Sequence, residues 1–258
     1  MIDTKIGATA WRESGDGTPV VFLHGLGGTR ESWNPQLTDM SAQWRCLAWD
    51  MPGYGDSDPE TPLTFPSIAS RLVDFLDAAS IDSAHLVGLS FGGMHALHTA
   101  LRFPGRVRSL VLADTSAAFG ADPDEWISAR LQGFDPSVID AIVGRPLTPT
   151  IAAELKAAFS RIPAEGFAAA LHCLVTHDVV DQLSGILTPT LVMVGALDEE
   201  TPVSYSRTLV DGIADATLVV LDGVGHLSPS EAPEVFNHHL RSFLAHIESL
   251  PHTEREST

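Results

Sequence analysis

The chain has 258 residues, of which 44% are hydrophobic, so it is long and apolar enough to bury one sizeable core. It carries 15 Lys and Arg against 33 Asp and Glu, a net charge of −18, and such an acidic surface repels nucleic acid. The first residues lack the apolar segment of a secretory signal, and no stretch approaches the roughly 18 apolar residues of a membrane span. We therefore expect a cytoplasmic protein with no nucleic-acid or membrane partner.

Strand-like and helix-like segments alternate along the first half of the chain. Short apolar runs that end in glycine or a polar residue predict strands at 19–25, 45–55, 84–89 and 107–114. Helical periodicity lies between them, most clearly from Ile68 to Ala79. Because the connections are short, this alternation favours a parallel sheet with helices on both faces.

The alternation stops at about residue 118. From there to residue 187 the sequence predicts short helices separated by Pro and Gly, with no strand-like run. The earlier pattern then resumes, with strands predicted at 188–198 and 216–226 and helices near 202–213 and 230–247. We expect a core domain formed by 1–117 and 188–250, a helical lid over 118–187, and a flexible tail at 251–258.

One serine lies where a predicted strand meets a predicted helix, in the stretch GLSFGG at 88–93. The spacing G-x-S-x-G also occurs by chance. At this position, however, a tight turn would raise the Ser90 hydroxyl above the carboxyl edge of the sheet. Gly88 and Gly92 would let the strand and the helix approach without side-chain clashes. Ser90 is therefore the candidate nucleophile.

A serine nucleophile needs a base, and the base needs an orienting carboxylate. Among 11 histidines, His226 is the candidate base because it follows the last predicted strand in a glycine-flanked loop. Asp198 ends the strand before that histidine and is the candidate carboxylate. Asp114, at the end of the strand after the Ser90 helix, is the competing candidate. The positions at strand ends favour Ser90, Asp198 and His226 as a triad.

Two backbone N–H groups are candidates for an oxyanion hole. Leu26 lies in the glycine-rich loop HGLGG at 24–28, and Phe91 begins the helix after Ser90, where the helix dipole favours negative charge. We expect His24 to hold this loop in place rather than to catalyse. His95 and His98 have i, i+3 spacing but no nearby partner residues for a metal. We therefore expect no metal and no organic cofactor.

Several segments resemble the α/β-hydrolase fold superfamily: HGLGG at 24–28, DMPGYGDSD at 50–58, GLSFGG at 88–93, GALDEETP at 195–202 and GVGHLSPSEAPEVFN at 223–237. The resemblance covers 7–247, and the chain order of nucleophile, acid and base is also that of the superfamily. It implies an α/β-hydrolase fold, with a mostly parallel sheet, helices on both faces and a helical lid inserted after the sixth strand. Because the segment before residue 19 is short, we expect the N-terminal hairpin of this fold to be trimmed.

Within the superfamily, the chain is most similar to 3-oxoadipate enol-lactonases and their close relatives. The resemblance implies a serine hydrolase that cleaves a small lactone or carboxylic ester through an acyl-enzyme. Hydrolysis of a C–C bond in a ring-cleavage product, haloperoxidase-like side chemistry, and a non-catalytic ligand receptor on the same scaffold remain alternatives.

An acidic substrate would need a cation in the lid of this acidic chain. The lid offers Arg130, Arg145, Lys156 and Arg161. Arg130 lies one helical turn after Trp126, a spacing that suits a flat acidic ligand. We therefore expect Trp126 and Arg130 to bind the substrate, with Arg130 holding its carboxylate.

Overall fold

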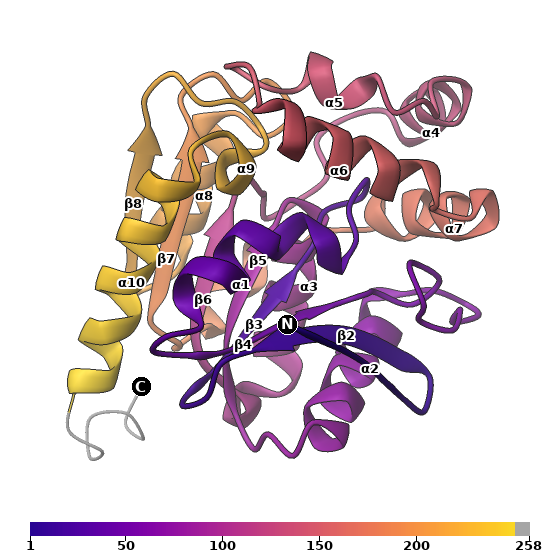
Figure 1. Cartoon of the computed structure of the whole chain (residues 1–258). Helices are drawn as coiled ribbons and strands as arrows, with labels where there is room; N and C mark the ends of the chain where they lie inside the picture. Colours follow the sequence, from indigo (N-terminus) through magenta and orange to yellow (C-terminus); the bar gives the residue numbers. More distant parts are fainter. Residues whose placement is uncertain (251–258) are drawn as a thin grey trace.

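A single eight-stranded sheet organises the molecule (Figure 1). The computed structural model describes residues 1–250, and the tail predicted to be flexible, 251–258, lies outside the described residues. The strand order is β1-β2-β4-β3-β5-β6-β7-β8; β1–β2 and β2–β4 pair antiparallel, and the other neighbours are parallel. The predicted α/β fold with a mostly parallel sheet is confirmed. The strands are β1 Ile2–Ile6, β2 Thr9–Ser14, β3 Pro19–Leu23, β4 Arg45–Trp49, β5 Ala84–Leu89, β6 Val107–Ala113, β7 Thr190–Gly195 and β8 Ala216–Leu221.

The N-terminal hairpin is present, and the expectation that it would be trimmed is wrong. β1 and β2 pair from Ile2 to Ile6, and only two residues separate the strands. Gly7 adopts a φ of 58°, a left-handed conformation that a two-residue hairpin turn favours and that glycine accepts at little cost. A segment too short for a longer connection therefore still forms two paired strands.

Helices cover both faces of the sheet. Residues of α2, α3 and α8 belong to one apolar core, and residues of α1 and α10 belong to a second core on the opposite face. The helices are α1 Asn34–Met40, α2 Phe65–Ala78, α3 Phe91–Arg102, α4 Pro123–Gln132, α5 Val138–Ala141, α6 Pro149–Ser160, α7 Ala164–Leu174, α8 Val203–Gly212, α9 Ser228–Glu231 and α10 Pro233–Ser249, with 3₁₀ turns η1 Arg30–Trp33, η2 Pro104–Arg106 and η3 Val180–Gly185.

Helix α2 shows how local sequence starts these elements. The Thr64 hydroxyl accepts a hydrogen bond from the Ser67 N–H, and the Ser67 hydroxyl accepts one from the Thr64 N–H. This reciprocal capping satisfies two donors that a helix start leaves without partners. Ile68, Leu72 and Phe75 then recur on one face and are fully buried, so the helix docks on the sheet.

Four helices, α4 to α7, lie together between β6 and β7 in the chain and cover the carboxyl edge of the central strands (Figure 1). An antiparallel bridge between Ala118 and Asp178 joins the two ends of this helical segment. Its position after the sixth strand is as expected, while its action as a lid stays a prediction. Within residues 1–250, no helix combines the length and the apolar character that crossing a bilayer needs.

Candidate active site

Ser90 occupies a strained turn between β5 and α3. Its φ of 53° and ψ of −119° lie in a region that residues with a side chain rarely adopt. The turn is held by its backbone, since the Ser90 N–H donates to the Ala113 carbonyl at 2.8 Å. The Thr115 hydroxyl donates to the Ser90 carbonyl at 2.7 Å. Strain of this kind is typical of a nucleophile presented at a sheet edge.

The glycines around Ser90 are required by close backbone contacts. A Cβ atom on Gly88 would collide with the backbone of Gly92, and one on Gly92 would collide with the Leu23 carbonyl. Strand β5, helix α3 and the end of β3 therefore meet only because both positions lack a side chain. This is the approach of strand and helix that the spacing of GLSFGG predicts.

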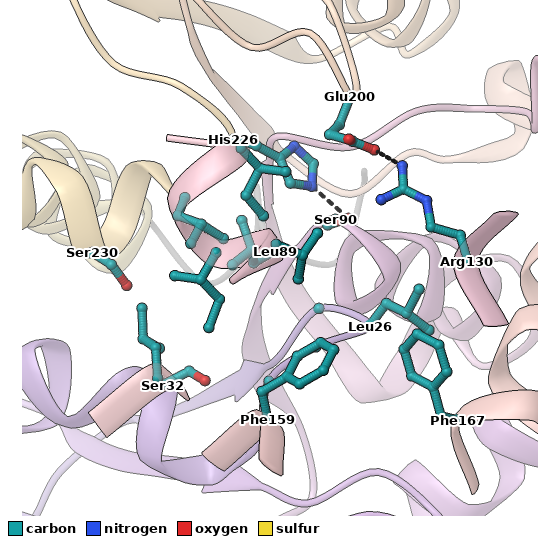
Figure 2. A pocket seen from close by; sticks show the side chains of 18 of the residues that line it. Leu26, Ser32, Leu89, Ser90, Arg130, Phe159, Phe167, Glu200, His226 and Ser230 are labelled. Carbon is teal, nitrogen blue, oxygen red and sulfur yellow. Dashed lines mark hydrogen bonds and ion pairs between the residues drawn. The ribbon is translucent and has the colours of Figure 1, made fainter. Parts of the chain in front are cut away.

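The structure brings the three predicted triad residues together. The His226 Nε2 lies 3.0 Å from the Ser90 Oγ (Figure 2). On the other side of the ring, the His226 Nδ1 lies 3.0 Å from each carboxylate oxygen of Asp198. His226 and Asp198 are both buried, whereas Ser90 is partly accessible. The arrangement has the connectivity that nucleophilic catalysis by a serine requires.

The electrostatics of this group favour a charged Asp198 and a basic His226. Burial alone would lower the pKa of His226, but the hydrogen bond and charge of Asp198, with Asp114 and Glu200 further off, raise it above its ordinary value. Burial alone would raise the pKa of Asp198, but its bonds to His226 and Thr201 lower it. The carboxylate is thus ionised where it can stabilise a protonated imidazole.

Asp114, the competing carboxylate, supports two loops instead of contacting the base. Its Oδ1 accepts from the Gly195 N–H at 2.9 Å, at the end of β7, and its Oδ2 accepts from the Ser228 N–H at 3.1 Å. These two residues lie near Asp198 and His226 in the chain. Complete burial is the main cause that raises the pKa of Asp114 to about 7. The geometry therefore favours Asp198 as the partner of His226.

The predicted oxyanion-hole residues, Leu26 and Phe91, lie in two segments next to Ser90. Phe91 is the first residue of α3, so its N–H has no carbonyl partner within the helix. Leu26 lies in the loop after β3, and the adjacent Gly25 packs so closely that a Cβ there would lie 3.3 Å from the Ser90 Cβ. Both positions are compatible with the predicted oxyanion hole, which stays a prediction.

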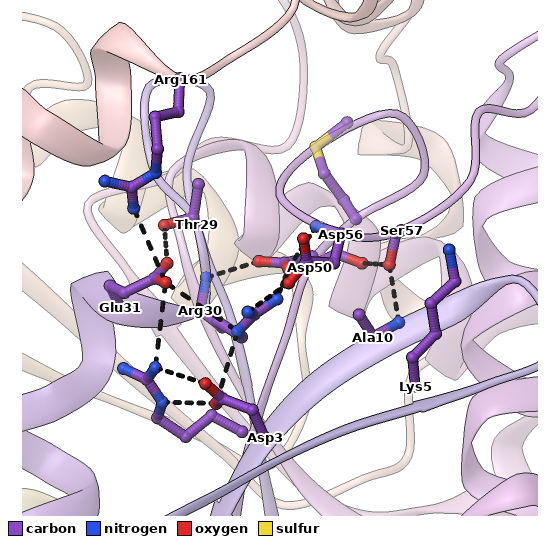
Figure 3. Close-up of polar contacts among 12 residues, drawn as sticks. Asp3, Lys5, Ala10, Thr29, Arg30, Glu31, Asp50, Asp56, Ser57 and Arg161 are labelled. Carbon is purple, nitrogen blue, oxygen red and sulfur yellow. Dashed lines mark hydrogen bonds and ion pairs between the residues drawn. The ribbon is translucent and has the colours of Figure 1, made fainter.

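Charged residues support the loop that carries Leu26, and two of them, Arg30 and Asp50, are buried (Figure 3). The Arg30 N–H donates to the Asp50 Oδ1 at 2.8 Å, and the Arg30 guanidinium is ion-paired with the same carboxylate. A second ion pair, of 2.5 Å, joins Arg30 to Asp56. His24 adds backbone contacts: its Nδ1 lies 2.8 Å from the Gly25 carbonyl, and its Nε2 accepts from the Met51 N–H at 3.1 Å. These contacts fit the structural role expected of His24.

His95 and His98 both contact the Phe65 ring. His98 stacks on Phe65 and its Nε2 lies 3.1 Å from the Nδ1 of His177, whose own Nε2 faces the Ser116 carbonyl at 2.9 Å. Burial lowers the pKa of His98 to about 3 and that of His177 to about 4. These rings are neutral and form part of the packing between α3 and the end of the helical segment.

A cavity of about 940 Å³, a volume that includes its open mouth, lies above Ser90 and His226 (Figure 2). Trp126 and Arg130 line it, while their binding of a substrate stays a prediction. Its other walls are mostly apolar side chains of α5, α6, α7 and neighbouring segments, among them Ile139, Ile142, Leu155, Phe159, Phe167 and Leu174. The helical segment thus covers Ser90 and His226 with mostly apolar side chains.

A second hollow adjoins the first and shares five of its lining residues, among them Ser90 and His226. Its space is about 540 Å³, and its walls include Ser116, Phe119 and Tyr205. The candidate nucleophile therefore has room on two sides. Such an arrangement can hold the two parts of a molecule that is cleaved at Ser90.

Arg130 has a partner that the sequence analysis did not predict. Its guanidinium forms an ion pair with Glu200, and its Cζ lies 5.1 Å from the centre of the Trp126 ring. It is therefore not the unpaired cation that the expected carboxylate anchor requires. The other three cations of the helical segment, Arg145, Lys156 and Arg161, do not line the cavity.

Comparison with known proteins identifies the family of the chain. Residues 18–233, most of the chain, match the family model described as alpha/beta hydrolase fold. The chain belongs to the α/β hydrolase family. The predicted membership of this family of hydrolases is thus confirmed.

Relatives of this α/β hydrolase have hydrolytic activities in their names. The chain is 33% identical to a Variovorax paradoxus protein named as a carbamate hydrolase, RutD, over 90% of this chain and 93% of the relative. It is 28% identical to 3-oxoadipate enol-lactonase 1 of Acinetobacter baylyi, over 89% of each chain. Among solved structures, it resembles the enol-lactonase of Burkholderia xenovorans with a TM-score of 0.84 and 26% identity, over 95% of this chain and 100% of the other.

Glu231 is a buried carboxylate near the candidate base that the sequence did not predict. Glu231 is 5% exposed, and its two oxygens accept hydrogen bonds from the N–H groups of Gly144, Arg145, Gly225 and Leu227 at 2.9–3.2 Å. Two of these donors flank His226, and the other two lie in the helical segment. The sequence offers no signal that singles it out, because Glu231 lies in the mixed stretch LSPSEAPEVFN at 227–237, which also holds the exposed Glu234.

Thr201 is a second residue that the sequence analysis missed. Its hydroxyl donates to the Asp198 Oδ2 at 2.7 Å, and its N–H donates to Oδ1 at 3.0 Å. The Glu200 N–H donates to the same Oδ1 at 2.9 Å. The turn after Asp198 therefore orients the carboxylate that faces His226.

Proposed function

We propose that the protein is a serine hydrolase that cleaves a small carboxylic ester or lactone through an acyl-enzyme. The observation that carries the proposal is the chain of contacts from Ser90 to His226 to Asp198, with 3.0 Å at each step, at the base of an apolar cavity. Relatives named as an enol-lactonase and a carbamate hydrolase support acyl chemistry of this kind.

In the proposed reaction, the Ser90 Oγ attacks the substrate carbonyl carbon while the His226 Nε2 takes the hydroxyl proton. The carbonyl oxygen becomes an oxyanion. When the tetrahedral intermediate collapses, the C–O bond to the leaving group breaks and the His226 Nε2–H protonates the departing oxygen. In a lactone, the freed hydroxyl stays attached to the acyl group.

Water completes the proposed cycle by the same route. His226 takes a proton from water, the hydroxide attacks the acyl carbon, and the bond to the Ser90 Oγ breaks as that oxygen regains its proton. Asp198 holds the imidazole in the tautomer that presents an unprotonated Nε2, and it stabilises the ring when it is charged. The N–H groups of Leu26 and Phe91 would bind both oxyanions, each worth about 10²–10³ in rate.

Ser90→Ala tests the proposal directly. The variant should lose hydrolysis of p-nitrophenyl hexanoate, and a fluorophosphonate probe should label the wild-type protein but not the variant. Ser242→Ala is the matched control, because Ser242 is exposed on α10 and lines neither hollow beside Ser90. Turnover that survives in Ser90→Ala, or equal labelling of Ser90→Ala and the wild type, would contradict the assignment.

A panel of substrates then separates the chemical classes. Esters, lactones, a carbamate and a vinylogous diketone assayed side by side compare acyl transfer with C–C bond hydrolysis. The proposal predicts turnover of esters or lactones. Turnover of the diketone alone would contradict it.

A further inference from the structure

The charges inside the cavity are few and paired. Of the residues that line it, only Arg130, Glu200 and His226 carry ionisable side chains. Two of them, Arg130 and Glu200, form an ion pair with each other across the cavity wall (Figure 2). The cavity therefore offers an incoming ligand an apolar surface and a charge pair that sums to zero.

Each member of the pair is fixed by a second contact. Helix α4 places Trp126 and Arg130 one turn apart, and the guanidinium lies over the indole ring at 5.1 Å. Glu200 is fixed through its backbone, because its N–H donates to the Asp198 Oδ1. This backbone contact places Glu200 beside Asp198, and the Glu200 carboxylate pairs from there with the Arg130 guanidinium.

A substrate with a carboxylate would meet this arrangement unfavourably. To bind Arg130 it would have to displace the Glu200 carboxylate, which is already positioned by the chain. If it did not displace Glu200, its charge would lie near two carboxylates, Glu200 and Asp198, in a chain of net charge −18. A neutral ester or lactone of similar size avoids both costs.

We propose that Glu200 is a specificity-determining residue that occupies Arg130 and restricts the cavity to neutral acyl groups. The proposal rests on the proposed serine hydrolase function and names its substrate class. It replaces the expectation that Arg130 binds a substrate carboxylate in the wild-type protein. It also predicts that Arg130 becomes free to bind a substrate carboxylate when the charge of Glu200 is removed.

Two esters of equal length provide the test. p-Nitrophenyl hexanoate and mono-p-nitrophenyl adipate each carry a six-carbon acyl chain, and they differ only in a terminal methyl group or carboxylate. The measured quantity is kcat/KM for the adipate divided by kcat/KM for the hexanoate, after subtraction of spontaneous hydrolysis. An effect on the triad that both esters share cancels in this ratio.

The wild-type ratio should lie below about 0.1, and Glu200→Gln should raise it by about tenfold or more, since a charge-assisted hydrogen bond to the released Arg130 becomes available. The double variant Glu200→Gln with Arg130→Gln should lose most of this gain. Thermal unfolding of each variant checks that it is folded.

Three results would overturn the proposal: a wild-type ratio near one, a ratio that Glu200→Gln leaves unchanged, or a gain that persists in the double variant. The first needs no variant, so the proposal can fail even if Glu200→Gln does not fold. If the wild type hydrolyses neither ester and the fluorophosphonate probe does not label Ser90, the proposed function itself fails. Labelling and turnover of the hexanoate therefore distinguish the two failures.

Discussion

Glu231 joins the loop of the candidate base to the helical segment, and Glu231→Gln tests how much this link contributes. The Oε2 atom accepts from the N–H groups of Gly144, Arg145 and Gly225, and Oε1 accepts from the Leu227 N–H at 3.0 Å. A glutamine has the same shape but only one acceptor oxygen. Its NH₂ group must therefore face at least one buried N–H donor.

The expected loss of unfolding free energy follows from the number of hydrogen bonds that the glutamine can still accept. With the amide oxygen in the place of Oε2, three hydrogen bonds remain but lose their charge assistance, and the Leu227 N–H is left without an acceptor. An unsatisfied buried donor costs about 1–3 kcal/mol, and weakening three bonds adds to this. Because glutamine also avoids the desolvation of a buried charge, part of the loss is offset. We expect Glu231→Gln to lower the free energy of unfolding by about 2–4 kcal/mol.

Catalysis should fall as well, because Gly225 and Leu227 flank His226. A small displacement of a catalytic group can reduce a rate by about 10²-fold. We expect kcat for p-nitrophenyl hexanoate to fall by about 10- to 100-fold, with a smaller change in KM. Urea unfolding measures the stability, and steady-state kinetics separates kcat from KM.

Glu154→Gln is the matched control, because Glu154 is exposed on α6 and should change the free energy of unfolding by less than about 0.5 kcal/mol. If Glu231→Gln is as stable as this control and keeps the wild-type kcat, the buried hydrogen bonds of Glu231 do not hold the His226 loop. The reasoning from donor counts would then be refuted.

Two further predictions concern the triad. Asp198→Asn should lower kcat by about 10³–10⁴, because the imidazole loses the partner that sets its tautomer, whereas Asp114→Asn should mainly lower stability; steady-state kinetics in which Asp114→Asn is the more damaging to kcat would assign the acid to Asp114. Since His226 must be neutral to accept the Ser90 proton and its pKa is raised, the rate should be full at high pH and fall as the pH drops through a value above 6.5. A pH profile of kcat/KM with its acid limb centred at or below 6.5 would contradict this.

The parts of the fold that were predictable depend on patterns local in the chain. Buried parallel strands are continuous apolar runs, such as the one from Pro19 to Leu23, and they stand out from the sequence. The N-terminal hairpin was missed because its first strand, Ile2–Ile6, is mostly exposed and mixes polar with apolar residues. Its pairing depends on the turn at Gly7 and on β4, and neither is evident from the strand itself.

The candidate site was predictable where its residues follow strand ends. Parallel strands bring their carboxyl ends to one edge, so Ser90, Asp198 and His226 could be expected to meet although 136 positions separate the first from the last. The choice between Asp198 and Asp114 needed the structure, because both follow strands at the same edge. Only the contacts show that one faces the imidazole and the other faces two backbone N–H groups.

The ion pair between Arg130 and Glu200 could not be predicted in the same way, because no periodicity relates a surface helix to a loop 70 residues away. The sequence does show that Glu200 lies close to Asp198 in the chain. Asp198, Glu200 and Thr201 lie within four consecutive positions, so one turn both orients the triad carboxylate and occupies the cavity cation. The proposed role of Glu200 in substrate selection is linked to the base, since the charge of Glu200 also raises the pKa of His226. We therefore expect Glu200→Gln to lower the pKa of His226, in addition to its expected effect on the adipate-to-hexanoate ratio, and a pH profile of kcat/KM for p-nitrophenyl hexanoate checks this.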